Sequence, residues 1–202
     1  TVELLIATDG GEQYAERLNE MWPTLQDDFA QYAAPLARAL PYMNDAYAQK
    51  VETAVRSMVE SREENRFGNP FGVPISDGGW GSSGIVLGVA MQNYILHTAF
   101  PDLVEPDVTI NGFNYVLGRH PGSSMSLVSG IGTHTKTNAY GINRADFSFI
   151  PGGIVPGPII VNTDFPEMKE QWPYHWLDSE YVIPEGALYI YVANAMDELT
   201  SE

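Results

Sequence analysis

Apolar residues recur every three or four positions in the first half of the chain, as they do along the buried face of an α-helix. Residues 11–39 follow this pattern, and Pro23 and Pro35 within them predict helix boundaries or kinks. Residues 44–64 follow it more regularly, and Asn44 is placed to cap the start of that helix. The pattern predicts at least two helices in this part of the chain.

Three further segments predict helices that are more apolar. Residues 82–99 follow a loop rich in glycine and proline, and Ser82 or Ser83 can cap them. Their composition predicts burial on most sides. Residues 106–118 end in a glycine, which is a common helix terminator, and residues 181–199 close the chain as another apolar helix.

Residues 119–178 have no strong hydrophobic period and are rich in glycine, proline, serine, threonine and asparagine. This stretch is far longer than the usual connection of about 4–6 residues. Disordered segments are poor in aromatic residues, whereas this one contains Tyr140, Phe147, Phe149, Phe165, Trp172, Tyr174 and Trp176. The sequence therefore predicts a helical scaffold that carries a long, ordered binding loop.

The charge of the chain narrows its possible partners. Ten Lys and Arg residues against 26 Asp and Glu residues give a net charge of −16. This charge argues against nucleic acid and anionic membranes, and permits a neutral or cationic partner. Acidity that only keeps a secreted protein soluble is the simpler interpretation. No run approaches the roughly 18 apolar residues of a membrane helix.

The residue inventory also excludes several classes of site. The chain has no cysteine, so disulfides, zinc–thiolate sites and cysteine nucleophiles are excluded. Neither a Gly-x-Ser-x-Gly elbow nor a phosphate loop occurs. The histidines are too widely separated to form the usual metal-binding pairs: His97, His120, His134 and His175. We expect neither a metal nor a cofactor.

Glu180 is the strongest candidate for chemistry. It lies between the aromatic loop, which ends near Trp176, and the last apolar helix, which begins near Tyr181. Aromatic neighbours desolvate a carboxyl group and favour its protonated form, as a general acid requires. A carboxylate at this place can instead simply cap the helix.

Polar and aromatic side chains of the loop are candidates for sugar contacts. Trp172 and Trp176 lie close to Glu180 in sequence and can stack on the apolar faces of sugar rings, or fill the core. His120 and His134 are loop residues that can form hydrogen bonds with sugar hydroxyl groups.

The order of several motifs resembles the C-terminal half of family 9 glycoside hydrolases. The resemblance runs from about residue 70 to the end of the chain. The motifs are Trp80-Gly81-Ser82-Ser83, Tyr115-Val116-Leu117-Gly118-Arg119-His120-Pro121, Ser126 to Gly132, Asn143-Arg144, Gly152-Gly153 and Ser179-Glu180.

The resemblance implies a mainly α fold, in which residues 1–202 form the C-terminal half of an (α/α)6 barrel with long aromatic-rich loops. It further implies inverting hydrolysis of β-glycosidic bonds in a polysaccharide or oligosaccharide. Glu180 matches the general acid of the family, and Arg144 matches an arginine of its sugar-contacting loop. A secreted or periplasmic enzyme of polysaccharide degradation is the expected context.

This sequence departs from the family pattern at three places. His120 replaces an asparagine, Gly141-Ile142-Asn143 replaces a pair of histidines, and Glu185 replaces an aromatic residue. The histidine and aromatic positions contact sugar in the family, so their replacement argues against cellulose as the substrate, and an added carboxylate such as Glu185 would suit an amino sugar. The choice between endo and exo action stays open as well.

The catalytic base of the family has no counterpart in this chain. It comes from an Asp-x-x-Asp motif near the start of the family's catalytic domain, and neither Asp77 nor Asp146 matches it. We therefore expect the N-terminal half of the barrel to be missing, the chain alone to be inactive, and apolar faces around Val86, Val89 and Ile95 to be exposed. The alternatives are a non-catalytic carbohydrate-binding or structural remnant of the same fold, and an unrelated helical enzyme.

Overall fold

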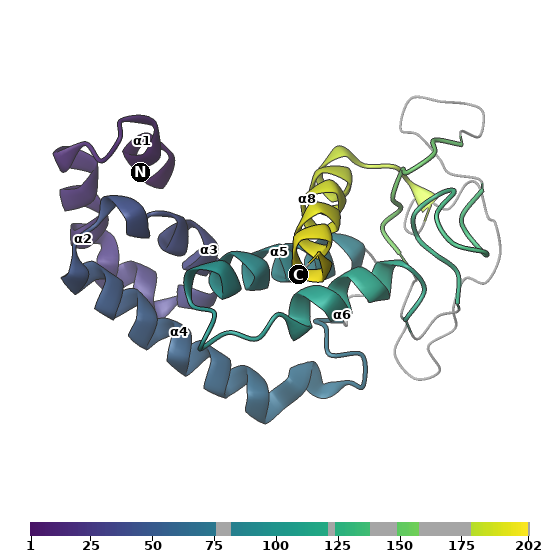
Figure 1. The fold of residues 1–202 in the computed structure, drawn as a ribbon, viewed down its shortest axis with the longest axis horizontal. Helices are drawn as coiled ribbons and strands as arrows, with labels where there is room; N and C mark the ends of the chain where they lie inside the picture. The colour runs from purple at the N-terminus through teal and green to yellow at the C-terminus, as the bar shows by residue number, and fades with distance from the viewer. Residues whose placement is uncertain (76–81, 121–123, 138–148, 158–178, 202) are drawn as a thin grey trace. The chain divides into compact units, whose positions relative to one another are not determined.

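The protein is mainly α-helical, as the sequence predicts (Figure 1). The computed structural model describes residues 1–75, 82–120, 124–137, 149–157 and 179–201. Its helices are α1 (Val2–Ala7), α2 (Glu12–Asp27), α3 (Phe29–Arg38), α4 (Asp45–Asn65), α5 (Ser82–Ala99), α6 (Asp107–Val116) and α8 (Ile183–Thr200), with short 3-10 turns η1 (Leu40–Tyr42) and η2 (Arg66–Gly68). Within these residues, no helix is long and apolar enough to cross a membrane.

The helices belong to two compact units. Unit 1 comprises Thr1–Asn65 and Gln92–Glu105, and unit 2 comprises Arg66–Met91 and Pro106–Glu202. Each unit has a cluster of buried apolar side chains of its own. That residues 1–202 form part of a single catalytic domain stays a prediction.

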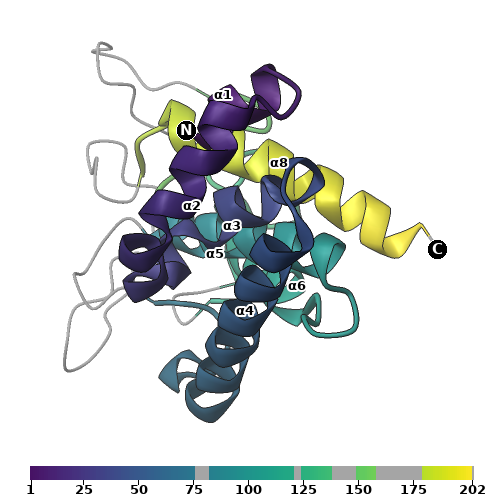
Figure 2. The ribbon, with the colours of Figure 1, turned by 90° about the vertical axis from the view of Figure 1, so that its left-hand side faces the viewer.

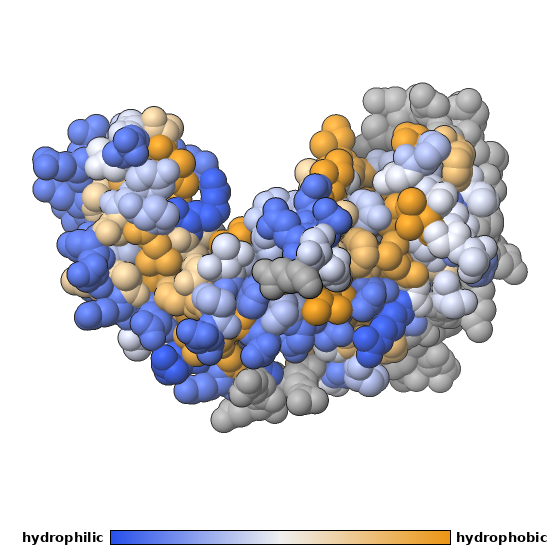
Figure 3. All heavy atoms as spheres, in the orientation of Figure 1, coloured by the Kyte–Doolittle hydropathy of each residue, from blue (hydrophilic) through white to orange (hydrophobic). Residues whose placement is uncertain are grey.

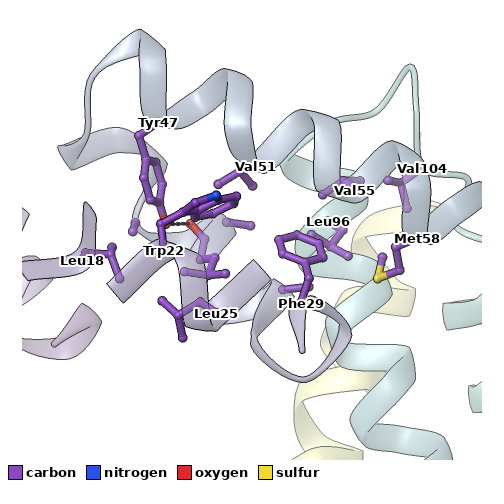
Figure 4. Close-up of a cluster of buried hydrophobic side chains, with 14 of the residues drawn as sticks. Leu18, Trp22, Leu25, Phe29, Tyr47, Val51, Val55, Met58, Leu96 and Val104 are labelled. Atoms are coloured by element: carbon purple, nitrogen blue, oxygen red, sulfur yellow. Dashed lines mark hydrogen bonds between the residues drawn. The ribbon is translucent and has the colours of Figure 1, made fainter. Parts of the chain in front are cut away.

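Helices α2, α3 and α4, drawn in Figure 2, supply most of the core of unit 1, and Leu96 of α5 and Val104 complete it (Figure 4). The Trp22 ring meets the Tyr47 ring edge-on, with 5.9 Å between ring centroids. The buried Tyr47 hydroxyl donates a hydrogen bond of 3.1 Å to the Leu36 carbonyl, and burial raises the pKa of Tyr47 above its ordinary value. Tyr47 therefore joins α4 to α3 through both apolar packing and a satisfied polar group.

One predicted helix start is confirmed, and neither proline marks a helix boundary, so of the two alternatives predicted for them only a kink remains. The Tyr47 N–H donates a 3.0 Å hydrogen bond to Asn44 Oδ1, so Asn44 caps α4 as expected. Pro23 and Pro35, however, lie inside α2 and α3, and the break between these helices is at Asp28. Residues on both sides of each proline are buried, and this packing outweighs the hydrogen bond that each proline removes.

In unit 2, α5, α6 and α8 pack with the chain segments that follow α6. Gly112 of α6 lies directly against Ala90 of α5: a Cβ atom at Gly112 would be 2.7 Å from the Ala90 Cβ. Thr109 Oγ1 donates a 3.0 Å hydrogen bond to the Ala90 carbonyl at the same contact. The glycine thus permits a close approach of two helices that any side chain would separate.

The apolar face that the sequence predicts to be exposed on α5 is exposed only in part: Val89 and Ile95 are half-buried, and Ile85 is 47% exposed. Val86 is 1% exposed and belongs to the core, because α6 and the loops cover that face of α5. Helix α8 also exposes Ile183, Ile190 and Tyr191, with exposed fractions of 88%, 64% and 39%. Figure 3 shows apolar side chains gathered over the N-terminal end of this helix. These positions share one face of α8, at helical spacing.

Candidate functional site

Segments from three parts of the sequence come together in unit 2. The segment 124–137 folds back on itself: the Ser126 N–H donates to the His134 carbonyl at 2.7 Å, and the Lys136 N–H donates to the Ser126 carbonyl at 3.2 Å. It also joins the segment 149–157, since the Val155 N–H donates to the Leu127 carbonyl at 3.0 Å. The described part of the predicted binding loop is therefore held by backbone hydrogen bonds in spite of its irregular sequence.

Glycines of the recognised motifs make the turns in these segments. Gly118 has φ +116°, and a Cβ atom there would lie 2.7 Å from the Ser124 carbonyl oxygen. Gly130 and Gly132 have φ +79° and +99°, a conformation that L side chains rarely adopt. These motif positions shape the backbone and need not touch a substrate.

Glu180 precedes α8 and does not belong to it. The helix begins at Ile183, its N-cap is Val182, and the acidic residue of its first turn is Glu185. Pro184 favours this start, because proline has no N–H to donate and is best accommodated in the first turn of a helix. The expectation that Glu180 opens the helix is therefore wrong, and so is the alternative in which it serves as a helix cap.

The carboxylate of Glu180 forms no side-chain interaction with the described residues, whereas the residues before and after it are held by hydrogen bonds. Glu180 is half-buried, and within the described residues its side chain forms no hydrogen bond or ion pair. On one side, Ser179 is fully buried and accepts a 3.3 Å hydrogen bond from Lys136 Nζ. On the other, the Tyr181 hydroxyl lies 2.7 Å from Ser129 Oγ. This arrangement suits a carboxyl group that acts on a bound molecule rather than on the fold.

His120 has a structural environment. Its side chain is 8% exposed, its Nε2 atom lies 2.8 Å from the Met125 carbonyl oxygen, and its ring packs against Tyr115 with 5.6 Å between centroids. Burial lowers the pKa of His120, and the hydrogen bond to Met125 opposes this shift only in part. The ring thus links the end of α6 to the segment 124–137. A sugar contact by His120 stays a prediction.

The lowered pKa of His120 predicts a pH-dependent stability. The unfolded chain, with an ordinary histidine pKa of about 6.5, takes up the proton before the folded chain does. The contribution of His120 is therefore present above about pH 6.5 and is lost as the pH falls below that value. We expect urea unfolding of wild type to lose more free energy between about pH 7.5 and about pH 5.5 than unfolding of His120→Gln does. Equal losses in the two proteins would contradict this account.

Comparison with known proteins relates this geometry to a known architecture. No family model matches the chain, and no curated protein matches it. Solved structures do match. A GH9 protein of Bacteroides ovatus superposes with a TM-score of 0.62 at 19% identity, over 82% of this chain and 32% of its own. The chain has the fold of part of a family 9 glycoside hydrolase.

Two further structures agree. A thermostable endoglucanase from Alicyclobacillus acidocaldarius matches with a TM-score of 0.57 at 18% identity, over 80% of this chain and 35% of its own. The GH family 9 endoglucanase J30 matches with a TM-score of 0.57 at 16% identity, over 81% and 33%. The chain therefore spans about a third of the length of the family 9 structures that it matches. The resemblance seen in the motifs is confirmed for the fold.

The other predicted contact residues fall into two groups on this family 9 fold. The side chain of His134 is exposed in the segment 124–137, so it is accessible to a ligand. Arg144, Trp172 and Trp176 lie outside the described residues, and their predicted roles in sugar binding stay predictions. In the described ranges, no group of three or more His, Asp and Glu side chains is arranged to hold a metal ion.

Glu185 lies against the beginning of α5. A Cβ atom built on Gly84 would be 3.1 Å from Glu185 Oε1, so the carboxylate touches the first turn of that helix. It also stands in the first turn of α8. Helix N-termini stabilise a negative charge, which gives Glu185 a structural role. The suggestion that it recognises an amino sugar stays a prediction.

Lys136 is a buried residue of the candidate site that the sequence pattern does not indicate. This lysine is 2% exposed, although lysine is almost never fully buried. It stands in a stretch of small polar residues with no hydrophobic period, so no local pattern indicated its burial. Two weaker features of the sequence point to Lys136. It is one of only ten basic residues in a strongly acidic chain, and it lies in the segment that is predicted to bind a ligand.

Proposed function

We propose that this chain is the acid-supplying part of an inverting glycoside hydrolase that cleaves β-glycosidic bonds. The observation that carries the proposal is the state of Glu180. Its carboxylate is half-buried and uncommitted among the described residues, and it stands at the position that matches the general acid in the motif order. The family 9 fold of the chain supports the same reaction class.

The reaction requires two carboxyl groups. Glu180 would protonate the glycosidic oxygen as the bond to the sugar breaks, and a second carboxylate would take a proton from the attacking water on the opposite face. In inverting enzymes these groups stand about 6.5–9.5 Å apart, which leaves room for that water. We propose that the base comes from a part of the barrel outside this chain, because the chain spans only about a third of the structures that it matches.

The non-catalytic alternative is less well supported. In a carbohydrate-binding or structural remnant, Glu180 would be expected to serve the fold, most simply as a cap of the last helix. The cap of α8 is Val182, and the first-turn carboxylate is Glu185. The side chain of Glu180 therefore neither caps α8 nor bonds to another described residue.

The substrate we propose is a neutral or cationic β-linked oligosaccharide or polysaccharide. The net charge of −16 disfavours acidic polymers and nucleic acid, since like charges repel. A secreted or periplasmic location suits this role, because a polysaccharide does not cross a membrane. The negative charge of the chain is compatible with a neutral glucan and with a cationic amino-sugar polymer, so both should be assayed as substrates.

We expect the 202-residue chain alone to release no reducing sugar from β-glucan or chitosan oligosaccharides. An acid without its base lacks one half of a concerted step, and proton transfer by each group is worth about 10²–10⁴-fold in rate. The remaining portion of the barrel, added in trans, is expected to restore hydrolysis. The matched control is the same mixture with Glu180→Gln. Hydrolysis by the chain alone would show that the base has been misplaced.

A further inference from the structure

We propose that Tyr181 and Lys136 are positioning residues that fix the place of Glu180 by anchoring the residues on its two sides. The inference rests on the proposed function of Glu180 as the general acid. It adds two residues that reach the acid through the backbone of its immediate neighbours, and neither of them belongs to the motifs that indicated the family.

Tyr181 is fixed by three contacts. Its hydroxyl group lies 2.7 Å from Ser129 Oγ and accepts a 3.2 Å hydrogen bond from the Ile150 N–H. Its ring lies on Gly153: a Cβ atom there would be 2.6 Å from Tyr181 Cε1 and 2.8 Å from Cδ1. No residue but glycine leaves room for the ring at this distance. The Gly152-Gly153 turn therefore forms the surface on which the Tyr181 ring packs.

The Gly152-Gly153 turn is itself joined to the segment 124–137 by backbone hydrogen bonds. The Ser129 N–H donates to the Gly153 carbonyl at 2.9 Å, and the Gly152 N–H donates to the Ser129 carbonyl at 2.8 Å. Ser129 is fully buried. Tyr181 thus binds to a turn whose two sides are already joined to each other by the backbone, and its position is set by all three segments.

Lys136 fixes the other side of the acid. Its side chain is 2% exposed, and Nζ donates a 3.3 Å hydrogen bond to Ser179 Oγ. Ser179 is 0% exposed and directly precedes Glu180. Burial of an ammonium group is costly unless it is compensated by polar partners, so a lysine at this place indicates a specific task. Its backbone is held as well, through the hydrogen bond to Ser126.

The consequence is a half-buried carboxyl group on a backbone that is anchored on both sides. The backbone of Glu180 runs between two anchored residues, while its carboxylate stays half-buried and unbonded among the described residues. A general acid must stand within about 2.6–3.2 Å of the oxygen that it protonates. A displacement of about 1 Å can cost about 10²-fold in rate. The contacts of Tyr181 and Lys136 keep Glu180 within that tolerance.

The first experiment measures the anchoring in this chain itself, without any assay of activity. In Tyr181→Phe and Lys136→Met, amide hydrogen exchange of peptides that cover residues 179–182 is expected to rise about tenfold, the value of one lost hydrogen bond. Matched controls are Tyr47→Phe, which removes a buried hydroxyl in unit 1, and Lys50→Met, whose ammonium lies 6.0 Å from the Trp22 ring centroid. Unchanged exchange at residues 179–182 in both test variants would overturn the proposal.

The second experiment uses this chain assembled with the rest of the barrel and compares two leaving groups. On a β-linked oligosaccharide, which needs a proton on the leaving oxygen, each variant is expected to lower kcat about 10–100-fold with KM unchanged. On a dinitrophenyl β-glycoside, whose leaving group needs no proton, the loss is expected to stay below about twofold. A merely structural role would lower both rates alike, and that result would overturn the proposal.

In the same assay, Glu180→Gln distinguishes a failure of the proposed function from a failure of the positioning role alone. If it leaves turnover of the oligosaccharide unchanged, the proposed function fails, and the positioning role falls with it. If it abolishes that turnover while Tyr181→Phe and Lys136→Met keep wild-type kcat, the acid stands and the positioning inference alone is overturned.

Discussion

Replacement of Glu180 by glutamine is expected to lower turnover of a β-linked oligosaccharide by about 10²–10⁴-fold, the range for loss of a general acid. The amide keeps the shape of the side chain but has no acidic proton that it can transfer to the leaving oxygen. Because the Glu180 side chain forms no hydrogen bond or ion pair among the described residues, the free energy of unfolding is expected to stay close to that of wild type. KM should therefore stay close to its wild-type value.

Steady-state kinetics of the chain assembled with the rest of the barrel test this prediction. Glu105→Gln is a suitable control, since Glu105 is exposed in unit 1 and the chemical change is the same. The melting temperatures of both variants should match that of wild type. Turnover of Glu180→Gln within a factor of about three of wild type would end the assignment, because no lost acid has so small an effect.

Replacement of Trp22 by alanine is expected to lower the free energy of unfolding by about 3–5 kcal/mol, the usual result of deleting a buried aromatic side chain. Trp22 is 8% exposed and packs against the rings of Phe29 and Tyr47, with 6.4 and 5.9 Å between centroids. The ammonium of Lys50 lies 6.0 Å from its ring centroid. The indole therefore joins α2 to the first residues of α3 and α4, and no neighbour can fill its volume (Figure 4).

Urea unfolding, followed by circular dichroism, measures this loss. The control is Leu4→Ala, because Leu4 is 51% exposed and its truncation leaves no cavity, so a change within about 0.5 kcal/mol is expected. A loss below about 1 kcal/mol for Trp22→Ala would show that the cluster drawn in Figure 4 collapses around the missing ring or does not govern stability.

The sequence alone determined the features that depend on local interactions. Helical periodicity located α4, α5, α6 and α8, because each has an apolar face or is apolar throughout. Asn44 indicated the start of α4 because a helix cap involves residues only three apart. The order of short motifs indicated the fold, since their glycines are required by turns such as that at Gly118.

The tertiary structure decided everything that depends on contacts between distant residues. Packing on both sides of Pro23 and Pro35 kept α2 and α3 continuous where local rules predicted a boundary or a kink. The meeting of α6 and the loops with α5 buried Val86, which the sequence had suggested would be exposed. Neither outcome is encoded in the neighbours of the residue concerned, because burial is a property of the assembled surfaces.

The candidate site shows the same division. The sequence singled out Glu180 from its place in the motif order and beside aromatic residues, but it could not show that Val182 rather than Glu180 begins α8. Lys136 and Ser179 are 43 residues apart, and Ser129 and Tyr181 are 52 apart. Contacts over such separations leave no periodic trace in a single sequence, since they follow from the path of the loops and not from local propensity. The sequence thus named the residue that could act, and only the folded chain showed what holds it in place.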